Sequence, residues 1–537
     1  MTKITTDFVG TESAAVTKLR LTEILEGWAY DPGSYTTWGD ARSDMNALLS
    51  GTAIGTIGAT EIAGSFLPKI NALNEPVPFL VDVSFGNGED GSFISIPDAE
   101  IFTDTAGTTL ATWGNSVARI NDPSPNERHP IQANAALRAK LGRAPVDVRN
   151  LLQRTEEFDS GWILSAGATM TSNAAVAPDG TMSADRIDFA DSSPSRIEQG
   201  AANGLLQTFS VWLRTVSGTL TLIVGRSAVL GQTFTVTEEW QRFSVTNVDL
   251  FAGISNGQNV AKSVFAWGAQ LELGSEVTPY QRVGNTLDIT ESGVPSFAFL
   301  RFDLSDDVMP TVFPDGLEGD LMIFGRKGSW IQRDVSIAPG SNLNIGPTTI
   351  PNGPSGLMAA LGDIVGWTAV NRTLSATEVN RLVSYHRGRG AKGLLVPGPE
   401  LVVNGDFSAG GDGWDFVPGV TFSGGLATYL GGNDADRLRQ FVPDLSTTAF
   451  YLMNVEVPTV RAGRPRIEWK GSGLSGTDIG FADWITANVG TRSGIIQYPG
   501  GGREISFRAT NFFIGPDSHD WDVGSVSLRE LIPQEEL

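Results

Sequence analysis

The chain has 537 residues, which is more than one hydrophobic core usually serves, so we expect three or four domains. Its 60 acidic residues outnumber the 38 Lys and Arg, and a formal net charge of −22 argues against nucleic acid as a partner. The absence of cysteine excludes disulfides, thiolate metal sites and a cysteine nucleophile.

The 63 glycines and 28 prolines are spread along the chain, so turns recur every few residues, as short-stranded β-sandwiches require. The composition therefore predicts an all-β, multidomain fold. The longest apolar stretches fall short of the roughly 18 to 20 residues that cross a bilayer, and the N-terminus opens no signal-peptide apolar region. We therefore expect neither membrane insertion nor secretion by the usual route.

The first 75 residues differ from the rest because their pattern is partly helical. Thr11 to Glu26 carries apolar residues at nearly helical spacing. The loop that follows contains Trp28, Tyr30, Tyr35 and Trp38, which either fill a small local core or dock against another chain. We interpret residues 1–75 as an N-terminal attachment region.

From about Pro76 apolar and polar residues alternate, as in Phe79, Val81, Val83 and Phe85, which predicts a strand. The segment from Ile101 to Pro145, with a turn at Asp104 to Thr109, resembles a stretch of phage tail and fibre proteins. That stretch opens a concanavalin-like or laminin-G-like sandwich. Later segments resemble the rest of the same sandwich, which implies a domain split between residues 76–149 and 286–397.

The split sandwich is predicted to end in a helix. The segment from Ile364 to Gly393 resembles the last strand and terminal helix of laminin-G-like domains. Ser375 is a suitable N-cap with Glu378 three residues on, which is the spacing of a capping box. The predicted buried stripe of this helix consists of Val379, Leu382, Val383 and His386.

Two further segments resemble carbohydrate-binding-module-like jelly rolls. In the first, residues 150–285, the resemblance rests on five stretches in order: Asn150 to Trp162, Ala177 to Gly180, Phe209 to Arg214, Glu239 to Phe243 and Phe265 to Glu272. In the second, residues 398–537, it rests on an opening strand at Glu400 to Trp414 and a closing strand at Val523 to Leu531. The resemblance implies that the first jelly roll is inserted into the split sandwich.

The same resemblance raises the question of a structural calcium ion. Many relatives of the C-terminal module carry an acidic pair just before the closing strand, where hard oxygen ligands hold calcium. Gly524 and Ser525 occupy those positions here, although Asp406 and Asp522 lie nearby in the pattern. A calcium site is therefore doubtful, and we predict no other cofactor and no metal site.

Phage receptor-binding proteins can be depolymerases, and a depolymerase would need catalytic groups in this sequence. Glycosidases need two carboxylates that face each other across a sugar. The adjacent Asp306 and Asp307 fit a solvated turn better, and His129, His386 and His519 lie in separate regions without zinc or triad spacing. We predict that the protein is not an enzyme.

Aromatic rings remain as candidates for stacking against sugars. Trp162, Trp240 and Trp267 coincide with positions that are usually structural in the resembling family, so we assign them to the core. The candidate carbohydrate-binding residues of the C-terminal module, for which a core role is an equal alternative, are Trp469, Trp484, Tyr498 and Trp521. Trp212 is a further candidate, and the sequence does not assign it to either face of its strand.

Taken together, the resemblances imply a virion protein of a tailed bacteriophage, a fibre, spike or tail component that binds host-surface polysaccharide. Residues 1–75 would contact other virion proteins, and the C-terminal module would be distal. We expect a homo-oligomer, with a trimer favoured, that is assembled in the host cytoplasm and displayed on the particle exterior. The alternatives are a purely structural tail or head component and, less favoured, a glycan depolymerase.

Overall fold

The computed structural model describes residues 84–85 and 88–534, with internal gaps. The gaps are 166, 192–194, 201–203, 249–250, 258–259, 348–353, 355, 417–418, 432–436, 443–444, 447, 463–464, 471–489, 498–503 and 510–518. The predicted attachment region at residues 1–75 and the predicted strand positions Phe79, Val81 and Val83 lie outside the described residues. The prediction is wrong at Phe85, the last position of that strand, which is helical together with Ser84.

The regular secondary structure of the described residues is almost entirely β-strand, which confirms the predicted all-β, multidomain fold. They fall into two compact units: the first contains Arg119–Arg138 and Phe302–Leu537 with the segment before Ile101, and the second contains Ile101–Ala118 and Ala139–Arg301. The domain boundaries drawn from the sequence stay a prediction. No helix in the described part of the chain is long and apolar enough to cross a bilayer.

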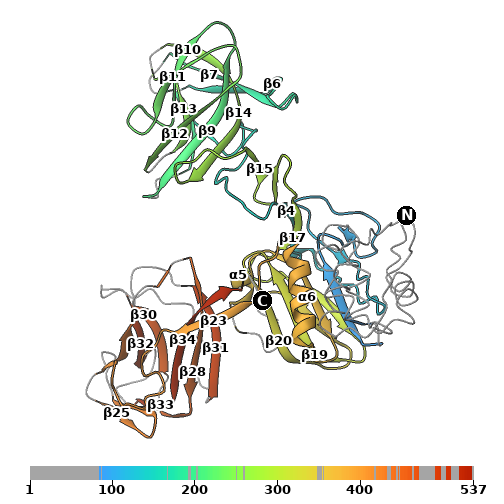
Figure 1. Cartoon of the computed structure of the whole chain (residues 1–537), viewed down its shortest axis with the longest axis vertical. Helices are drawn as coiled ribbons and strands as arrows, with labels where there is room; N and C mark the ends of the chain where they lie inside the picture. Colours follow the sequence, from blue (N-terminus) through green and yellow to red (C-terminus); the bar gives the residue numbers. More distant parts are fainter. Residues whose placement is uncertain are drawn as a thin grey trace, which may run out of the picture. The chain divides into compact units, whose positions relative to one another are not determined.

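Two five-stranded antiparallel sheets form a sandwich in the second unit (Figure 1). The strands of one sheet are, in order, β11 (Gln232–Val236), β10 (Leu220–Val224), β13 (Ala252–Ser255), β8 (Arg196–Gln199) and β5 (Ile163–Ser165). Those of the other are β12 (Gln241–Val248), β9 (Leu206–Thr215), β14 (Lys262–Leu273), β7 (Ala184–Phe189) and β6 (Thr169–Ala175). Alternate residues such as Phe209, Val211 and Val264 point between the sheets and are fully buried.

A smaller group of strands completes the second unit. It comprises β15 (Gln281–Asn285), β16 (Asp288–Glu291), β4 (Lys140–Ala144), β17 (Phe297–Arg301) and the short β2 (Ile101–Phe102). The predicted turn after β2 is present, because the Asp104 carboxylate accepts hydrogen bonds from the backbone N–H groups of Thr108 and Thr109.

In the first unit, strands that are far apart in the sequence pair with each other. β1 (Gly91–Ser95) lies antiparallel to β22 (Ile364–Val370), which also pairs with β19 (Leu317–Gly325). The remaining elements here are β3 (Arg119–Ile120), the 3-10 turn Ala135–Leu137, β18 (Met309–Phe313), β20 (Ser329–Ile337), β21 (Ser341–Ile345), α5 (Leu357–Leu361) and α6 (Ala376–Arg387).

Helix α6 begins as its sequence predicts. The Ser375 hydroxyl accepts from the Glu378 N–H while the Glu378 carboxylate accepts from the Ser375 N–H, which is a complete capping box. The predicted stripe is buried, and the His386 ring stacks on Phe324 of β19 with centroids 3.8 Å apart. The helix therefore packs its apolar face on the sheet.

The C-terminal module contains three four-stranded sheets around one core. The strands of the first sheet are, in order, β23 (Leu395–Glu400), β34 (Ser525–Pro533), β28 (Phe450–Val457) and β31 (Gly490–Gln497). Those of the second are β24 (Asp415–Phe416), β27 (Arg437–Phe441), β32 (Glu504–Ala509) and β30 (Pro465–Lys470). Those of the third are β25 (Val420–Ser423), β26 (Leu426–Gly431), β33 (His519–Val523) and β29 (Thr459–Ala462). Strand β34 confirms the predicted closing strand.

The predicted opening strand of this module is wrong over most of its length. Only Glu400 belongs to a strand, and the residues from Val402 to Trp414 form successive turns. The cause is local, since the Asn404 side chain binds three backbone groups of the following turns and Asn404 and Phe407 have positive φ. The preceding segment Pro397-Gly398-Pro399 is part of β23, which pairs with β34.

Candidate functional site

One of the rings predicted to stack against sugar is buried and does not lie at the surface. Trp521 in β33 is 1% exposed and lies in the core of the C-terminal module with Trp414. Its prediction as a carbohydrate contact is wrong, because the alternation of β33 turns Trp521 and Val523 inward. The side chains of Trp469, Trp484 and Tyr498 lie outside the described residues, so their role stays a prediction.

The carboxylates near the doubtful calcium position are bonded to protein groups. Both oxygens of Asp522 accept hydrogen bonds from Arg461, at 2.8 and 2.9 Å, and one also accepts from Thr428. The Arg461 guanidinium holds the pKa of Asp522 below its usual value. Asp406 is exposed and accepts from Ser408.

A second acidic group contains the sequence pair Asp306 and Asp307. Carboxylate oxygens of Asp303, Asp306 and Asp307 lie within 4.8 Å of one another in the bend before β18. The Asp303 carboxylate accepts from the backbone N–H groups of residues 305, 306 and 307, so it caps this bend. The turn is therefore confirmed, although Asp307 is buried and, of the pair, only Asp306 is solvated, and the geometry alone does not define a metal site.

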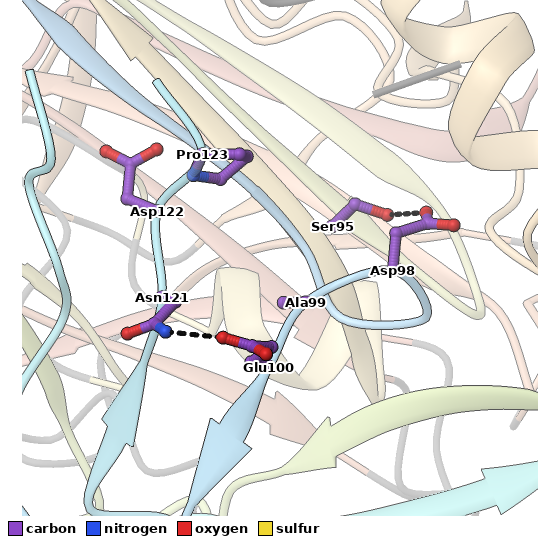
Figure 2. A pocket seen from close by; sticks show the side chains of 7 residues that line it. All are labelled: Ser95, Asp98, Ala99, Glu100, Asn121, Asp122 and Pro123. Carbon is purple, nitrogen blue, oxygen red and sulfur yellow. Dashed lines mark hydrogen bonds between the residues drawn. The ribbon is translucent and has the colours of Figure 1, made fainter. Parts of the chain in front are cut away.

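A pocket of about 240 Å³ opens in the first unit and is rich in carboxylates (Figure 2). Its lining residues are Ser95, Asp98, Ala99, Glu100, Asn121, Asp122 and Pro123. Asp98 accepts hydrogen bonds from Ser95, from Tyr385 and from Arg389. Glu100 accepts from the Asn121 side chain at 2.8 Å.

Asp122 is the carboxylate of this pocket whose pKa is perturbed most clearly. Burial raises its pKa to about 6, although hydrogen bonds from Ser124, Phe93 and Arg128 oppose the shift. Four donor groups occupy its two oxygens: three backbone N–H groups and the Ser124 hydroxyl. Asp122 therefore fixes the loop after β3, and its bonded oxygens are poorly placed to exchange a proton with a ligand.

A row of alternating cationic and aromatic residues crosses the outer face of the β12-β9-β14-β7-β6 sheet, the face turned away from the partner sheet. Phe265 of β14 lies opposite Arg186 of β7 on one side and opposite Arg214 of β9 on the other. The Arg214 guanidinium carbon lies 4.5 Å from the centroid of Phe265 and 5.3 Å from that of Trp240, just before β12. We call these four residues the Arg214 row.

All four residues of the Arg214 row are half-buried, so each side chain keeps part of its surface in solvent, 41% in the case of Arg186. Trp240 is anchored by a hydrogen bond of 3.0 Å from its indole N–H to the Val176 carbonyl. It is half-buried and packs against a small buried cluster that includes Trp267, outside the main core between the sheets, so the assignment of Trp240 to the core is confirmed only in part. The alternation of β9 explains this, since Val211 and Leu213 face inward and Arg214 faces outward.

The next row on the same face is largely covered. Trp212 lies opposite Trp267, which is 6% exposed, packs against Tyr280 and donates its indole N–H to Ser183. Trp267 is thus buried as predicted, but outside the main core, in a cluster with Ala175, Ala177 and Ala184. Trp212, the candidate from the inserted module, is half-buried beside the Arg214 row. Trp162 is in the main core.

The sequence did not predict Arg214 and Phe265 as binding residues, nor that Trp240 would be partly exposed. The alternation of side chains along the strand from Phe209 to Arg214 could have predicted the position of Arg214. Because Phe209, Val211 and Leu213 face the core, Trp212 and Arg214 lie on the opposite face. Register between strands, which brings Arg186 and Phe265 alongside, is not visible in the sequence.

No family model and no curated protein matches the chain. Among solved structures, the N-terminal tandem CBM22 domains of Paenibacillus barcinonensis Xyn10C align with 72% of this chain and 100% of their own, at 10% identity and a TM-score of 0.19. The family 11 carbohydrate-binding module of Clostridium thermocellum Lic26A-Cel5E aligns with 22% of this chain and 89% of its own, at 9% identity and a TM-score of 0.17.

A third structure, the enzymatically active domain of tailspike protein 4 from bacteriophage CBA120, aligns with 24% of this chain at 13% identity and a TM-score of 0.19. The alignment spans only 22% of that tailspike, and only 27% of the GH51 α-L-arabinofuranosidase MgGH51 is covered. Because these TM-scores are low, the description of this chain as β-sandwich modules rests on its own sheet topology.

Proposed function

We propose that this chain is a non-catalytic, glycan-binding protein of a tailed-phage virion, and that its inserted module holds the glycan on the Arg214 row. The observation that carries the proposal is the pair of partly exposed rings, Trp240 and Phe265, on the outer face of a sheet. The apolar C–H face of a sugar packs against aromatic rings, and neighbouring polar groups fix its hydroxyls.

Polar groups stand beside the rings where a sugar would need them. Arg186 donates to Asp188 at 2.8 and 2.9 Å, and Asp188 also accepts from Ser263, which lies two residues before Phe265 on β14. The side chains of Arg186 and Asp188 are 41% and 33% exposed, so both can also reach a ligand. Carboxylate, guanidinium and hydroxyl groups together match the donors and acceptors of sugar hydroxyls.

The role in a virion extends the proposal to the whole chain. Residues 1–75 attach the protein to other virion proteins, and the β-sandwich modules project from the particle exterior. A homo-oligomer, with a trimer favoured, would multiply weak glycan contacts into firm attachment to host polysaccharide. The modular resemblance in the sequence supports this part of the proposal.

The absence of catalysis is also proposed, with a purely structural virion role as the alternative. The carboxylates of the pocket in Figure 2 are engaged by protein donors, which supports binding over glycan cleavage. A purely structural protein would place the Arg214 row against another virion protein instead of a sugar.

The test is an array of bacterial surface polysaccharides probed with the full chain and with Trp240→Ala. We expect wild-type protein to bind a subset of the glycans, and Trp240→Ala to lose most of that binding while keeping its melting temperature. Loss of one stacking ring costs about 1–3 kcal/mol by analogy with base stacking, or roughly tenfold or more in affinity. Binding that survives in Trp240→Ala, or no binding by the wild type, would reject this site.

A further inference from the structure

We propose that the Arg214 row selects an acidic glycan, and that Arg214 binds an anionic group on the sugar. This inference rests on the proposed function and adds the class of ligand. Arg214 has no carboxylate partner among the described residues, in a chain whose formal net charge is −22. An unneutralised guanidinium on such an acidic protein is a local site for an anion.

Other arginines of the same module form ion pairs, except Arg242, which donates instead to the Thr278 carbonyl and the Ser210 hydroxyl. Arg186 pairs with Asp188 at 2.8 Å, and Arg226 pairs with Glu198 at 3.1 Å. Arg154 pairs with Glu157, and Arg282 pairs with both Glu156 and Asp288. Arg214 therefore stands apart from these four by its lack of an ion pair within the described part of the module.

The stacking of Arg214 leaves its hydrogen-bonding edge available. Among the described residues, the Arg214 guanidinium lies over the rings of Phe265 and Trp240. A guanidinium is planar, so ring contacts leave its N–H donors in the plane for a ligand. These donors form a fork that matches a carboxylate in two parallel hydrogen bonds. The rings also fix the orientation of the fork before a ligand arrives.

The surroundings favour a sugar over an acidic peptide. A uronic acid presents an apolar C–H face, hydroxyls and one carboxylate on a single ring. On the protein, the rings of Trp240 and Phe265, the polar pair Arg186 and Asp188, and the Arg214 guanidinium lie side by side along neighbouring strands. An acidic peptide would use the charge of Arg214 but would bring no matching set of hydroxyls.

The experiment measures the affinity of the full chain for oligogalacturonate and for neutral xylo-oligosaccharide of equal length by calorimetry. We expect tighter binding of the uronate, a weakening of that binding as sodium chloride is raised, and at least about tenfold loss in Arg214→Gln. Binding of the neutral ligand should fall by a smaller factor than binding of the uronate in Arg214→Gln. The matched control is Arg226→Gln, because Arg226 also lies over a ring, that of Phe251 at 4.5 Å, but is paired with Glu198.

The outcomes separate this inference from the proposed function. If Arg214→Gln binds the uronate as wild type does, or if neutral and acidic ligands bind equally, the acidic-glycan inference is wrong while glycan binding stands. If Trp240→Ala binds every glycan as wild type does, the proposed function fails as well. A sulfated dextran distinguishes sulfate from carboxylate as the anion, and polyglutamate that binds as tightly as the uronate would overturn recognition of a sugar.

Discussion

Replacing His386 by leucine should change how the stability of the split sandwich depends on pH. His386 is 0% exposed, and both of its ring nitrogens lack a hydrogen-bond partner among the described residues. Burial, reinforced by the positive charge of Arg389, lowers the pKa of His386 well below 6.5. The folded protein therefore keeps this imidazole neutral in mildly acidic solution.

The magnitude follows from linkage. Below pH 6.5 the unfolded chain takes up a proton at His386 and the folded chain does not, so stability falls as pH falls, by about 1.4 kcal/mol per pH unit. Between pH 6.5 and 5 the loss is about 2 kcal/mol. Asp122 acts in the opposite direction, because its raised pKa of about 6 lets the folded state bind a proton before the unfolded state does.

In a comparison of wild type with His386→Leu, the contributions of Asp122 and the other titrating groups to the pH dependence of stability cancel. Amide hydrogen exchange of peptides that cover β22 and α6 reports the opening free energy of this domain alone, which suits a chain of several modules. We expect the variant to gain about 2 kcal/mol relative to wild type when pH is lowered from 7 to 5. A difference between the two proteins that is the same at both pH values would refute the burial of a neutral imidazole.

Further predictions concern the fold, the chemistry and the anchor. Ser375→Ala removes the N-cap of α6 and should destabilise the same domain by about 0.5–2 kcal/mol in hydrogen exchange, whereas Ser384→Ala in the exposed part of the helix should not. Trp521→Ala should cost about 3–5 kcal/mol in the C-terminal module and leave exchange in β9 and β14 unchanged, and an unaffected melt would place the ring at the surface. Purified protein should release no reducing ends from host capsule or lipopolysaccharide, and activity that persists through further purification would show that it is an enzyme. Particles assembled with protein that lacks residues 1–75 should not carry it, and retention of the truncated protein would move the anchor elsewhere.

The sequence predicted the elements that local rules determine. The capping box of α6 uses side chains three residues apart, so Ser375 and Glu378 could be assigned without the fold. The buried stripe of the same helix follows from its period. The all-β fold follows from turn residues and alternation, which are also local.

The sequence failed where long-range packing decides. Trp240 and Trp521 are both tryptophans near strands, but their exposure depends on which face of each sheet meets the core. The turns after Glu400 depend on Asn404, whose side chain competes with strand pairing for backbone groups. The Arg214 row forms only because three strands pair in one register. That register depends on strands far apart in the sequence, so local patterns do not predict it.

The most direct test of the central claim is a crystal structure of the full chain with a bound oligosaccharide that the polysaccharide array selects. The account predicts that the sugar lies on the outer face of the β12-β9-β14-β7-β6 sheet, in contact with Trp240 and Phe265, with any anionic group on Arg214. A sugar bound instead to the C-terminal module or in the pocket at Asp98 and Asp122, with the Arg214 row vacant, would contradict it.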